Sequence, residues 1–282
     1  MYCVKILNHN KILIMILITG GTSFNSSHFI KNIDEDLIVL LNKAKPKIFQ
    51  DNIIYFENLK EFKKSDFRKE VKTIINFASS YNTKNELIPN FKSSFALLLK
   101  LFRMTRNMKL ETIINIGSYF QDIEKEKSSS YVMIKNLTDF YFSKIVKKIK
   151  YLNLKIGDTY GPDDTRNKIF KHLTSNKKNK KILFSGNNKD LFYLTYISDI
   201  TNALSYIIKN SELFKQSSIS LIKLYGHAIT LEELVNYYKS INNLNFELIF
   251  ESGVVRRPGL KNTKYDFSFL LDAQNIKNLK NI

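Results

Sequence analysis

The stretch Ile16-Leu-Ile-Thr-Gly-Gly-Thr-Ser-Phe-Asn-Ser-Ser-His-Phe29 decides the fold. An apolar run typical of a buried strand ends in a Thr-Gly-Gly-Thr turn, and a segment that can wind into a helix follows at once. A dinucleotide-binding βαβ unit begins in this way. Gly20 keeps the first of the three glycines of that pattern, but Ser23 and Ser26 stand where the second and third are expected. Taken alone, the stretch also fits a strand and loop of an unrelated α/β domain.

The composition is that of a globular protein with an unusual charge. The chain has 282 residues, enough to bury a full core, and 44 Lys and Arg against 26 Asp and Glu give a formal net charge of +18. A basic balance suits an anionic partner such as nucleic acid, a membrane surface or a phosphorylated small molecule. The only dense basic cluster, residues 177–181, has no aromatic residues between its lysines of the kind that stack bases. We therefore expect neither nucleic acid nor a membrane as partner.

Several classes of site and segment are not expected. The single cysteine, Cys3, rules out an intramolecular disulfide framework and is compatible with a reducing cytoplasm. The four histidines are scattered, so no metal site is predicted. The apolar run before Gly20 is far shorter than the roughly 20 residues of a membrane span. Met15 directly precedes this run, so residues 1–14 are interpreted as an N-terminal extension.

Apolar runs separated by helical patterns predict an α/β fold, a Rossmann-type doubly wound parallel sheet with a smaller C-terminal substrate-binding lobe. We expect a dinucleotide-binding domain over residues 15–162, to which later strands and helices return, and a mainly substrate-binding lobe over 163–282. After the first strand, further strands are expected at 36–41, 52–56, 73–78, 112–116, 152–156 and 182–184, and helices at 88–108, 130–149, 168–174, 199–209 and 230–241. Thr230 and Glu233 have the spacing of a capping box.

Tyr131 and Lys135 are the candidate catalytic pair. Their i, i+4 spacing near the start of a helix places both side chains on one face, where an ammonium stabilises a phenolate. A tyrosine in that environment exchanges a proton with a carbinol or carbonyl oxygen. The preceding strand ends in Gly117-Ser118, and the Ser118 hydroxyl can hold the same substrate oxygen. Tyr-x-x-x-Lys is common by chance in a Lys-rich chain, so its place after the fifth strand supports the interpretation more than the pair does.

Together these motifs resemble the extended short-chain dehydrogenase/reductases of the NAD-dependent epimerase/dehydratase type. Within that family the chain is most similar to nucleotide-sugar 4-ketoreductases of the CDP-abequose and CDP-paratose synthase kind. The resemblance runs in order over about residues 15–275. It rests on Thr19 to Phe24, Ser27-His28, Ile75 to Ala78, Asn115 to Phe120, Tyr131-x-x-x-Lys135, Tyr160 to Asp164, Asn167-Lys168 and Tyr196 to Ile200.

The resemblance implies roles for individual residues. Tyr131 would be the general acid, Lys135 would tune it and bind the nicotinamide ribose, and Ser118 would hydrogen-bond the keto oxygen. The expected cofactor-binding residues are Gly20, Gly21, Thr22, Ser23, Phe24, Asn25, Asn42, Lys43, Ala78 and Thr159. The expected substrate-binding residues are Ser80, Tyr119, Lys168 and Arg256.

The expected activity is NADPH-dependent reduction of a nucleotide-linked 4-keto-deoxysugar by a cytoplasmic homodimer. Related dehydratases carry an acidic pair right after the active-site hydroxyl, whereas here Tyr119 and Phe120 follow Ser118, which favours simple reduction or epimerisation. Asn42-Lys43 replaces the acidic residue expected after the second strand for NAD, which favours NADPH, with NADH or NAD as alternatives. A nucleotide-sugar 4-epimerase with NAD and a catalytically silent binding protein remain alternatives.

Overall fold

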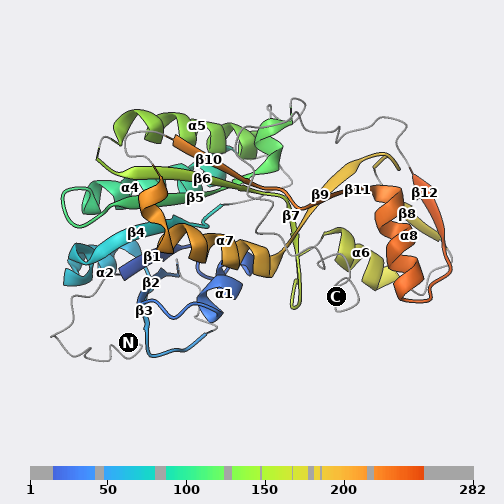
Figure 1. Cartoon of the computed structure of the whole chain (residues 1–282), viewed down its shortest axis with the longest axis horizontal. Helices are drawn as coiled ribbons and strands as arrows, with labels where there is room; N and C mark the ends of the chain where they lie inside the picture. Colours follow the sequence, from blue (N-terminus) through green and yellow to red (C-terminus); the bar gives the residue numbers. More distant parts are fainter. Residues whose placement is uncertain are drawn as a thin grey trace.

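The computed structural model describes residues 15–41, 48–79, 87–123, 129–146, 148–166, 168–176, 181–184, 186–214 and 219–250. Its central sheet has seven parallel strands in the order β10-β6-β5-β4-β1-β2-β3 (Figure 1). These strands are β1 (Met15–Thr19), β2 (Leu37–Leu40), β3 (Ile53–Phe56), β4 (Val71–Asn76), β5 (Thr112–Ser118), β6 (Lys150–Ile156) and β10 (Ile219–Leu224). The sequence order reverses between β1 and β4, so the predicted Rossmann-type fold is confirmed.

Helices cover both faces of this sheet, which is why its strands are almost continuously apolar. On one face, α1 (Phe24–Lys31) and α7 (Ile197–Lys209) pack on one buried cluster. On the other face, α2 (Leu59–Lys64), α4 (Leu97–Thr105) and α5 (Ser130–Ile145) pack on a second. Shorter helical pieces are η1 (Asp66–Lys69), α3 (Leu87–Asn90), the π-helical segment η2 (Phe91–Ala96), η3 (Tyr119–Asp122) and η5 (Ser211–Leu213).

Two expected helices differ in detail from the structure. The helix predicted over residues 88–108 consists of α3, η2 and α4 in succession, with a π-helical turn in the middle. The helix predicted over 130–149 ends at Ile145, because residues from Lys150 onward pair with β5 as strand β6. Strand β10 was not among the expected strands, although it closes one edge of the main sheet beside β6.

One row of buried polar side chains crosses the sheet from strand to strand. Thr19, Asn76, Asn115 and Asn153 are register partners on the adjacent strands β1, β4, β5 and β6. All four are buried. The Thr19 hydroxyl donates to Asn76 Oδ1 at 2.6 Å, and Asn76 Nδ2 donates to Asn115 Oδ1 at 2.8 Å. The row begins at the residue that directly precedes Gly20, so it links the predicted cofactor turn to the next two strands.

A smaller lobe lies beside the carboxyl edge of the sheet (Figure 1). It contains a three-stranded sheet of β7 (Asp158–Tyr160), β9 (Leu191–Tyr196) and β11 (His227–Thr230), a pair of β8 (Lys181–Phe184) and β12 (Glu247–Phe250), and the helices α6 (Ile169–Asn176) and α8 (Leu231–Ile241). The predicted capping box is confirmed, since the Thr230 hydroxyl accepts the Glu233 N–H at 3.2 Å and Glu233 accepts the Thr230 N–H.

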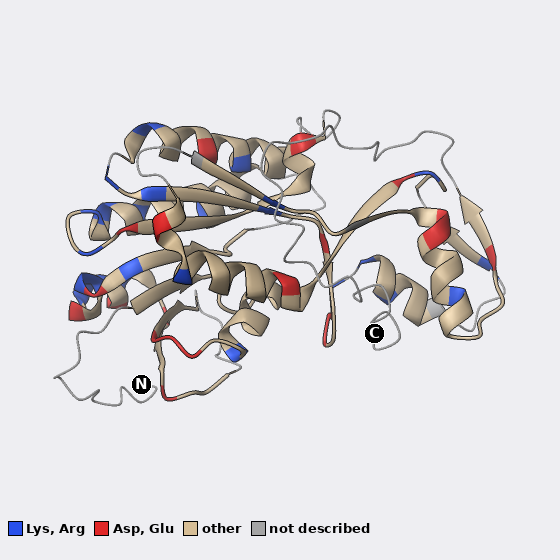
Figure 2. Ribbon diagram, in the orientation of Figure 1, with Lys and Arg blue, Asp and Glu red and all other residues tan. Residues whose placement is uncertain are grey.

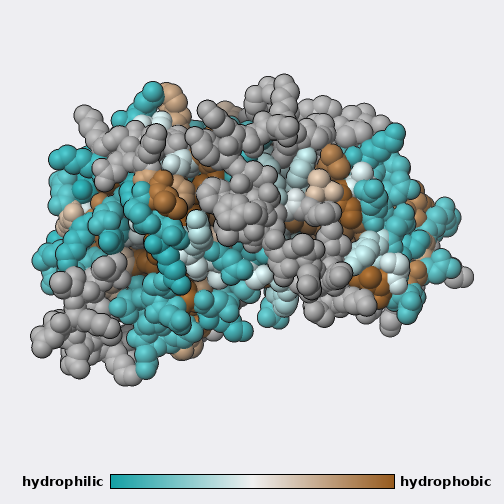
Figure 3. All heavy atoms as spheres, viewed as in Figure 1, coloured by the Kyte–Doolittle hydropathy of each residue, from teal (hydrophilic) through white to brown (hydrophobic). Residues whose placement is uncertain are grey.

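Charged groups and apolar side chains are both distributed over the surface. Lys and Arg lie on most elements with Asp and Glu among them (Figure 2). The face in view is mostly hydrophilic, with hydrophobic side chains in small separate patches (Figure 3). No helix within the described residues is long and apolar enough to cross a membrane.

Candidate functional site

The turn after β1 is built around two glycines. Gly20 has a φ of 68°, in the region that favours glycine, and a Cβ there would lie 2.7 Å from the backbone nitrogen of Ala78. A Cβ on Gly21 would lie 2.2 Å from a methyl group of Val39. The turn is therefore pressed between the ends of β4 and β2. Gly20, Gly21 and Ala78, three of the predicted cofactor residues, come together at the point where strand order reverses.

The two serines that replace glycines serve the turn and helix α1. Ser23 is the N-cap residue of α1, and its side chain accepts the Ser26 N–H at 3.3 Å. Ser26 is fully buried, and its hydroxyl donates to the Gly20 carbonyl at 2.6 Å. The N–H groups of Phe24 and Asn25, the first two residues of α1, have no carbonyl partner within the helix. The serines therefore leave the phosphate-binding feature of such a turn in place.

A loop that follows β7 closes over the same turn. The Arg166 guanidinium lies over the Phe24 ring, 4.2 Å from its centroid, and donates to the Thr159 carbonyl at 2.9 Å. Two further bonds of 2.6 Å join Arg166 to the carboxylate of Asp164. Lys168 Nζ lies 3.5 Å from the Thr159 hydroxyl, so the predicted substrate residue Lys168 and cofactor residue Thr159 are neighbours. Arg166 thus ties the start of α1 to the loop before α6.

The predicted catalytic residues meet where β5 ends and α5 begins. Lys135 is buried, and its ammonium donates to the Ile116 carbonyl of β5 at 2.6 Å. The same ammonium lies 4.9 Å from the centroid of the Tyr131 ring. Ser118 ends β5, and its hydroxyl accepts the Phe120 N–H at 3.3 Å. That hydroxyl keeps its own proton for donation to an acceptor.

Tyr119 lies among other aromatic residues rather than open to solvent. It is 1% exposed, and its hydroxyl donates to Asp158 Oδ2 at 2.6 Å. Its ring stacks on Phe120 and contacts Tyr193 and Tyr225. Tyr119 therefore shapes the neighbourhood of Ser118 through these contacts, whereas the prediction placed its side chain against the substrate.

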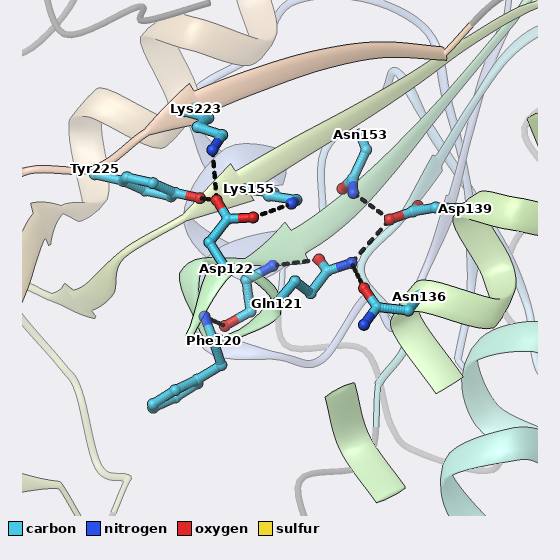
Figure 4. Close-up of polar contacts among 10 residues, drawn as sticks. Phe120, Gln121, Asp122, Asn136, Asp139, Asn153, Lys155, Lys223 and Tyr225 are labelled. Carbon is cyan, nitrogen blue, oxygen red and sulfur yellow. Dashed lines mark hydrogen bonds and ion pairs between the residues drawn. The ribbon is translucent and has the colours of Figure 1, made fainter. Parts of the chain in front are cut away.

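Asp122 joins the turn η3 to two strands of the main sheet (Figure 4). Lys155 of β6 and Lys223 of β10 each place an ammonium 2.6 Å from its carboxylate, and the Tyr225 hydroxyl donates to it as well. Burial raises the pKa of Asp122, but the hydrogen bonds from Lys155, Lys223 and Tyr225 outweigh that effect and hold the pKa below its usual value. Among the described residues, Asp122 is the acidic residue nearest in sequence to Ser118, and its charge is balanced by two lysines.

Four predicted site residues, Asn42, Lys43, Ser80 and Arg256, lie outside the described residues. Thr22 lies in the turn directly before Ser23, and Asn25 is the second residue of α1. Within the described part of the chain, no group of three or more His, Cys, Asp or Glu side chains is arranged to hold a metal ion.

Sequence reasoning missed Gln121, Asp122, Asp139 and Arg166. A signal for Gln121 was present, because Ser118-x-x-Gln121 has the spacing of a capping box, and the structure contains that box. Asp139 also has a signal, since it lies four residues after Lys135 and therefore on the same helix face. Arg166 and Asp122 have none, because their partners come from distant strands and loops.

Residues of this region fit a dinucleotide. The close approach of Gly20 and Gly21 to neighbouring strands leaves room for no side chain there, as a diphosphate-binding turn requires. The N-terminus of α1 supplies N–H donors for an anion. Ser118 lies at the carboxyl end of β5, the edge of the sheet where such folds hold their ligands. Lys135 of α5 is held near this end by its bond to the Ile116 carbonyl.

Comparison with known proteins agrees with this geometry. The model of the NAD dependent epimerase/dehydratase family matches residues 16–220. A CDP-abequose synthase of Salmonella muenchen is 21% identical over 266 residues, which are 90% of each chain. A UDP-N-acetylglucosamine 4-epimerase from Methanobrevibacter ruminantium M1, solved with UDP-N-acetylmuramic acid, has a TM-score of 0.73 at 16% identity and covers 95% of this chain and 96% of its own.

A UDP-glucuronic acid 4-epimerase from Bacillus cereus, solved with UDP-glucuronic acid and NAD, has a TM-score of 0.72 at 17% identity. This structural match covers 94% of this chain and 96% of the epimerase chain. At such identities the solved structures show the shared fold, while the family model spans most of the sequence. The chain belongs to the NAD-dependent epimerase/dehydratase family.

Proposed function

We propose that this chain is a cytoplasmic enzyme that uses NADPH to reduce the keto group of a nucleotide-linked 4-keto-deoxysugar, a step in the supply of precursors for surface polysaccharide. The single observation that carries the proposal is the position of Lys135. Its buried ammonium is held by the Ile116 carbonyl at the end of β5 and lies beside the Tyr131 ring. Ile116 is two residues before Ser118 in β5. A fixed ammonium next to a phenol at this place suits the phenol to protonate a ketone oxygen.

Each side chain has a separate part in this reaction. The Tyr131 hydroxyl gives its proton to the carbonyl oxygen as that oxygen gains negative charge, and the Lys135 ammonium stabilises the phenolate left behind. The Ser118 hydroxyl donates a hydrogen bond to the same oxygen and orients it. When bound, the reduced nicotinamide supplies the hydride.

The cofactor would lie at the turn between β1 and α1. Gly20, Gly21, Thr22 and Ser23 would hold its diphosphate, with N–H groups at Phe24 and Asn25, while Ala78 and Thr159 would line the path toward Ser118. Several structures of similar fold contain NAD. The preference for NADPH rests on Asn42 and Lys43, which would face a 2′-phosphate where NAD enzymes carry an acidic residue.

The substrate would enter between the sheet and the smaller lobe. Curated proteins similar to this chain are CDP-abequose synthases, and proteins of similar fold were solved with UDP-sugars. Lys168 lies beside Thr159 and carries a charge suited to a diphosphate. We assign Ser80 and Arg256 to the same substrate, and the segment 163–282 mainly to its binding.

Reduction is favoured over dehydration by the surroundings of Ser118. A dehydratase needs an acid and a base beyond the tyrosine, and the residues after Ser118 are Tyr119 and Phe120. The next acidic residue, Asp122, is bound by Lys155 and Lys223. No described residue of η3 therefore offers a carboxylate for a second proton transfer.

A screen of nucleotide-linked 4-keto sugars tests the activity, with NADPH oxidation as the readout. We expect turnover with at least one member of the class and none with the matching 4-hydroxy sugars. An epimerase would instead retain tightly bound NAD after purification and interconvert 4-hydroxy sugars, because its hydride returns to the substrate. If calorimetry detects neither NADPH nor NADP⁺ binding at millimolar concentration, the reductase proposal is wrong and a cofactor-independent binding protein is favoured.

We also propose a homodimer formed through α5. Met133, Leu137 and Phe140 lie at helical spacing along α5 and are 50%, 40% and 65% exposed. Ile88 and Phe91, on the neighbouring segment that packs on α5, add exposed apolar surface. Exposed apolar side chains on helical segments that pack together suit a self-complementary interface.

A further inference from the structure

The side chain of Gln121 bonds the backbone of Ser118 and two side chains of helix α5, and Figure 4 shows it directed at Asn136 and Asp139. Its Oε1 accepts the Ser118 N–H at 3.0 Å. Its Nε2 donates to Asp139 Oδ2 at 2.8 Å and to Asn136 Oδ1 at 3.0 Å, and both acceptors belong to α5. One amide group therefore connects the end of β5 to the helix that carries Tyr131 and Lys135.

The carboxylate of Asp139, which accepts from Gln121, is itself held by several other hydrogen bonds. It is buried, and besides Gln121 it accepts hydrogen bonds from the Tyr151 hydroxyl at 2.8 Å and from Asn153 Nδ2. Asn115 Nδ2 approaches Oδ1 at 3.5 Å. Each of these groups donates, so the site is arranged around a carboxylate that only accepts. Burial raises the pKa of Asp139, while the donors from Tyr151 and Gln121 oppose that change.

The same network reaches the cofactor turn. Asn115 accepts from Asn76, and Asn76 accepts from Thr19, the residue before Gly20. Hydrogen bonds among buried side chains thus run from the turn after β1, through β4 and β5, to α5 and back to Ser118. Hydrogen bonds between buried side chains restrict the residues that they join to one arrangement.

We propose that Gln121 is a positioning residue that holds Ser118 at a fixed place relative to Tyr131 and Lys135. The inference rests on the proposed ketone reduction. A neutral amide is suited to the place because it accepts from a backbone N–H on one side and donates to a carboxylate on the other. Leucine offers neither group, and ionised glutamate turns a second carboxylate toward Asp139. A displacement of about 1 Å at Ser118 is enough to lower turnover by about 100-fold.

Three variants separate positioning from general weakening. Gln121→Leu removes the bridge. Gln121→Glu keeps its shape and adds a titrating group. Tyr151→Phe is the matched control, because it removes another buried donor to Asp139 and leaves the Ser118 N–H bonded. The measurements are kcat and KM with the 4-keto sugar, NADPH affinity, thermal unfolding, and amide hydrogen exchange at Ser118 followed by NMR.

For Gln121→Leu we expect kcat to fall about 10- to 100-fold with NADPH affinity unchanged. We expect exchange at Ser118 to accelerate by about 10-fold or more while β5 amides before it stay protected. Tyr151→Phe should lower the unfolding temperature but keep kcat and Ser118 exchange near wild type.

Gln121→Glu should recover activity as the pH falls. A protonated carboxyl group donates to Asp139 and accepts from Ser118 as the amide does, whereas the ionised form is repelled by Asp139. The other titratable groups around this site are Lys135 of α5, Tyr151 and Lys155 of β6, and Asp122 of η3. These groups are present in wild type too, so a pH dependence found only in the variant belongs to position 121.

Two results would overturn the proposal. One is a Gln121→Leu enzyme whose kcat and Ser118 exchange match those of wild type. The other is an equal loss of kcat in Tyr151→Phe, which would mean that any weakening of the network has the same effect. If wild-type protein reduces no 4-keto sugar, the proposed function fails by itself, and Ser118 exchange in Gln121→Leu still decides whether Gln121 positions Ser118.

Discussion

Ser26 occupies the place of a glycine that normally allows helix and strand to pack closely, and its side chain is fully buried. The hydroxyl donates to the Gly20 carbonyl at 2.6 Å and lies 2.9 Å from the Ser23 hydroxyl. The Gly20 carbonyl also accepts a hydrogen bond from the Ser23 N–H at 3.0 Å. The serines therefore fasten the turn to the helix N-terminus, and their hydrogen bonds offset the loss of the two glycines.

Ser26→Ala tests this role. We expect the free energy of unfolding to fall by about 1 kcal/mol, because one buried hydrogen bond is lost with little change in volume. NADPH affinity should fall as well, since the Gly20 carbonyl is held less firmly. Urea unfolding and calorimetry measure the two effects. Ser27→Ala is the control, and equal losses in both variants would contradict a special role for Ser26.

Tyr131→Phe tests the proton donor. Turnover should fall by about 100-fold or more, because no other group replaces the phenol, while NADPH affinity stays within about twofold of wild type. Steady-state kinetics and cofactor titration measure these quantities. Tyr141→Phe on the same helix should keep full activity. Parallel losses of turnover and cofactor affinity in Tyr131→Phe would indicate a structural role instead.

At the scale of elements, the short turn η3 is held from two directions. Gln121 fastens it to α5, and the adjacent Asp122 fastens it to β6 and β10 through Lys155 and Lys223. Both lysines are buried, so each depends on Asp122 for its counter-charge. The turn after Ser118 is therefore one of the most constrained parts of the described chain.

Asp122→Asn should lower the free energy of unfolding at neutral pH by about 3 kcal/mol, because two buried ammonium groups lose their counter-charge. The folded state holds the pKa of Asp122 below its ordinary value of 3.8. Its stabilising effect is therefore complete above pH 3.8 and is lost as the pH falls through the lower folded-state pKa.

Urea unfolding of wild type and Asp122→Asn across this acidic range measures both effects. The difference between the two proteins should shrink toward low pH. A variant as stable as wild type at neutral pH would show that Lys155 and Lys223 do not need the carboxylate.

At the scale of the whole molecule, α5 has two roles on opposite sides. Its inner side carries Lys135 and Asp139, and its outer side carries the exposed strip of Met133, Leu137 and Phe140. In Figure 1, α5 runs along one edge of the molecule, where a second copy can reach it. An interface there would bury the back of the helix that holds Tyr131.

Phe140→Glu is expected to convert a dimer into monomers, because it places a charge in the apolar strip at its most exposed residue. Light scattering coupled to size-exclusion chromatography measures the mass. Leu213→Glu on η5 is the matched control, since Leu213 is 64% exposed and Phe140 65%. A wild-type chain that is monomeric at high concentration would contradict the proposed interface.

Local patterns in the sequence predict most strands of the main sheet and the i, i+4 pair of Tyr131 and Lys135, because each strand and the pair lie within one continuous segment. The catalytic role of the pair stays a prediction. Strand β10 escaped prediction, because its pairing with β6 joins segments far apart in the sequence. The ion pair of Asp122 with Lys223 was not predicted for the same reason, since the partners are 101 positions apart in the sequence. Lys135 was predicted, but its bond to the Ile116 carbonyl depends on how α5 packs on β5.

The row of Thr19, Asn76, Asn115 and Asn153 also limits how the strands can be misassembled. If one strand slid by a single residue, its polar side chain would turn to the opposite, mostly apolar layer and leave its hydrogen-bonded neighbours without partners. Each unbonded buried amide costs about 1–3 kcal/mol, so wrong alignments are penalised several times over. Many slipped pairings of Ile-rich strands would bury similar apolar area. The row thus specifies the register of these strands, which aliphatic side chains alone would specify less strictly.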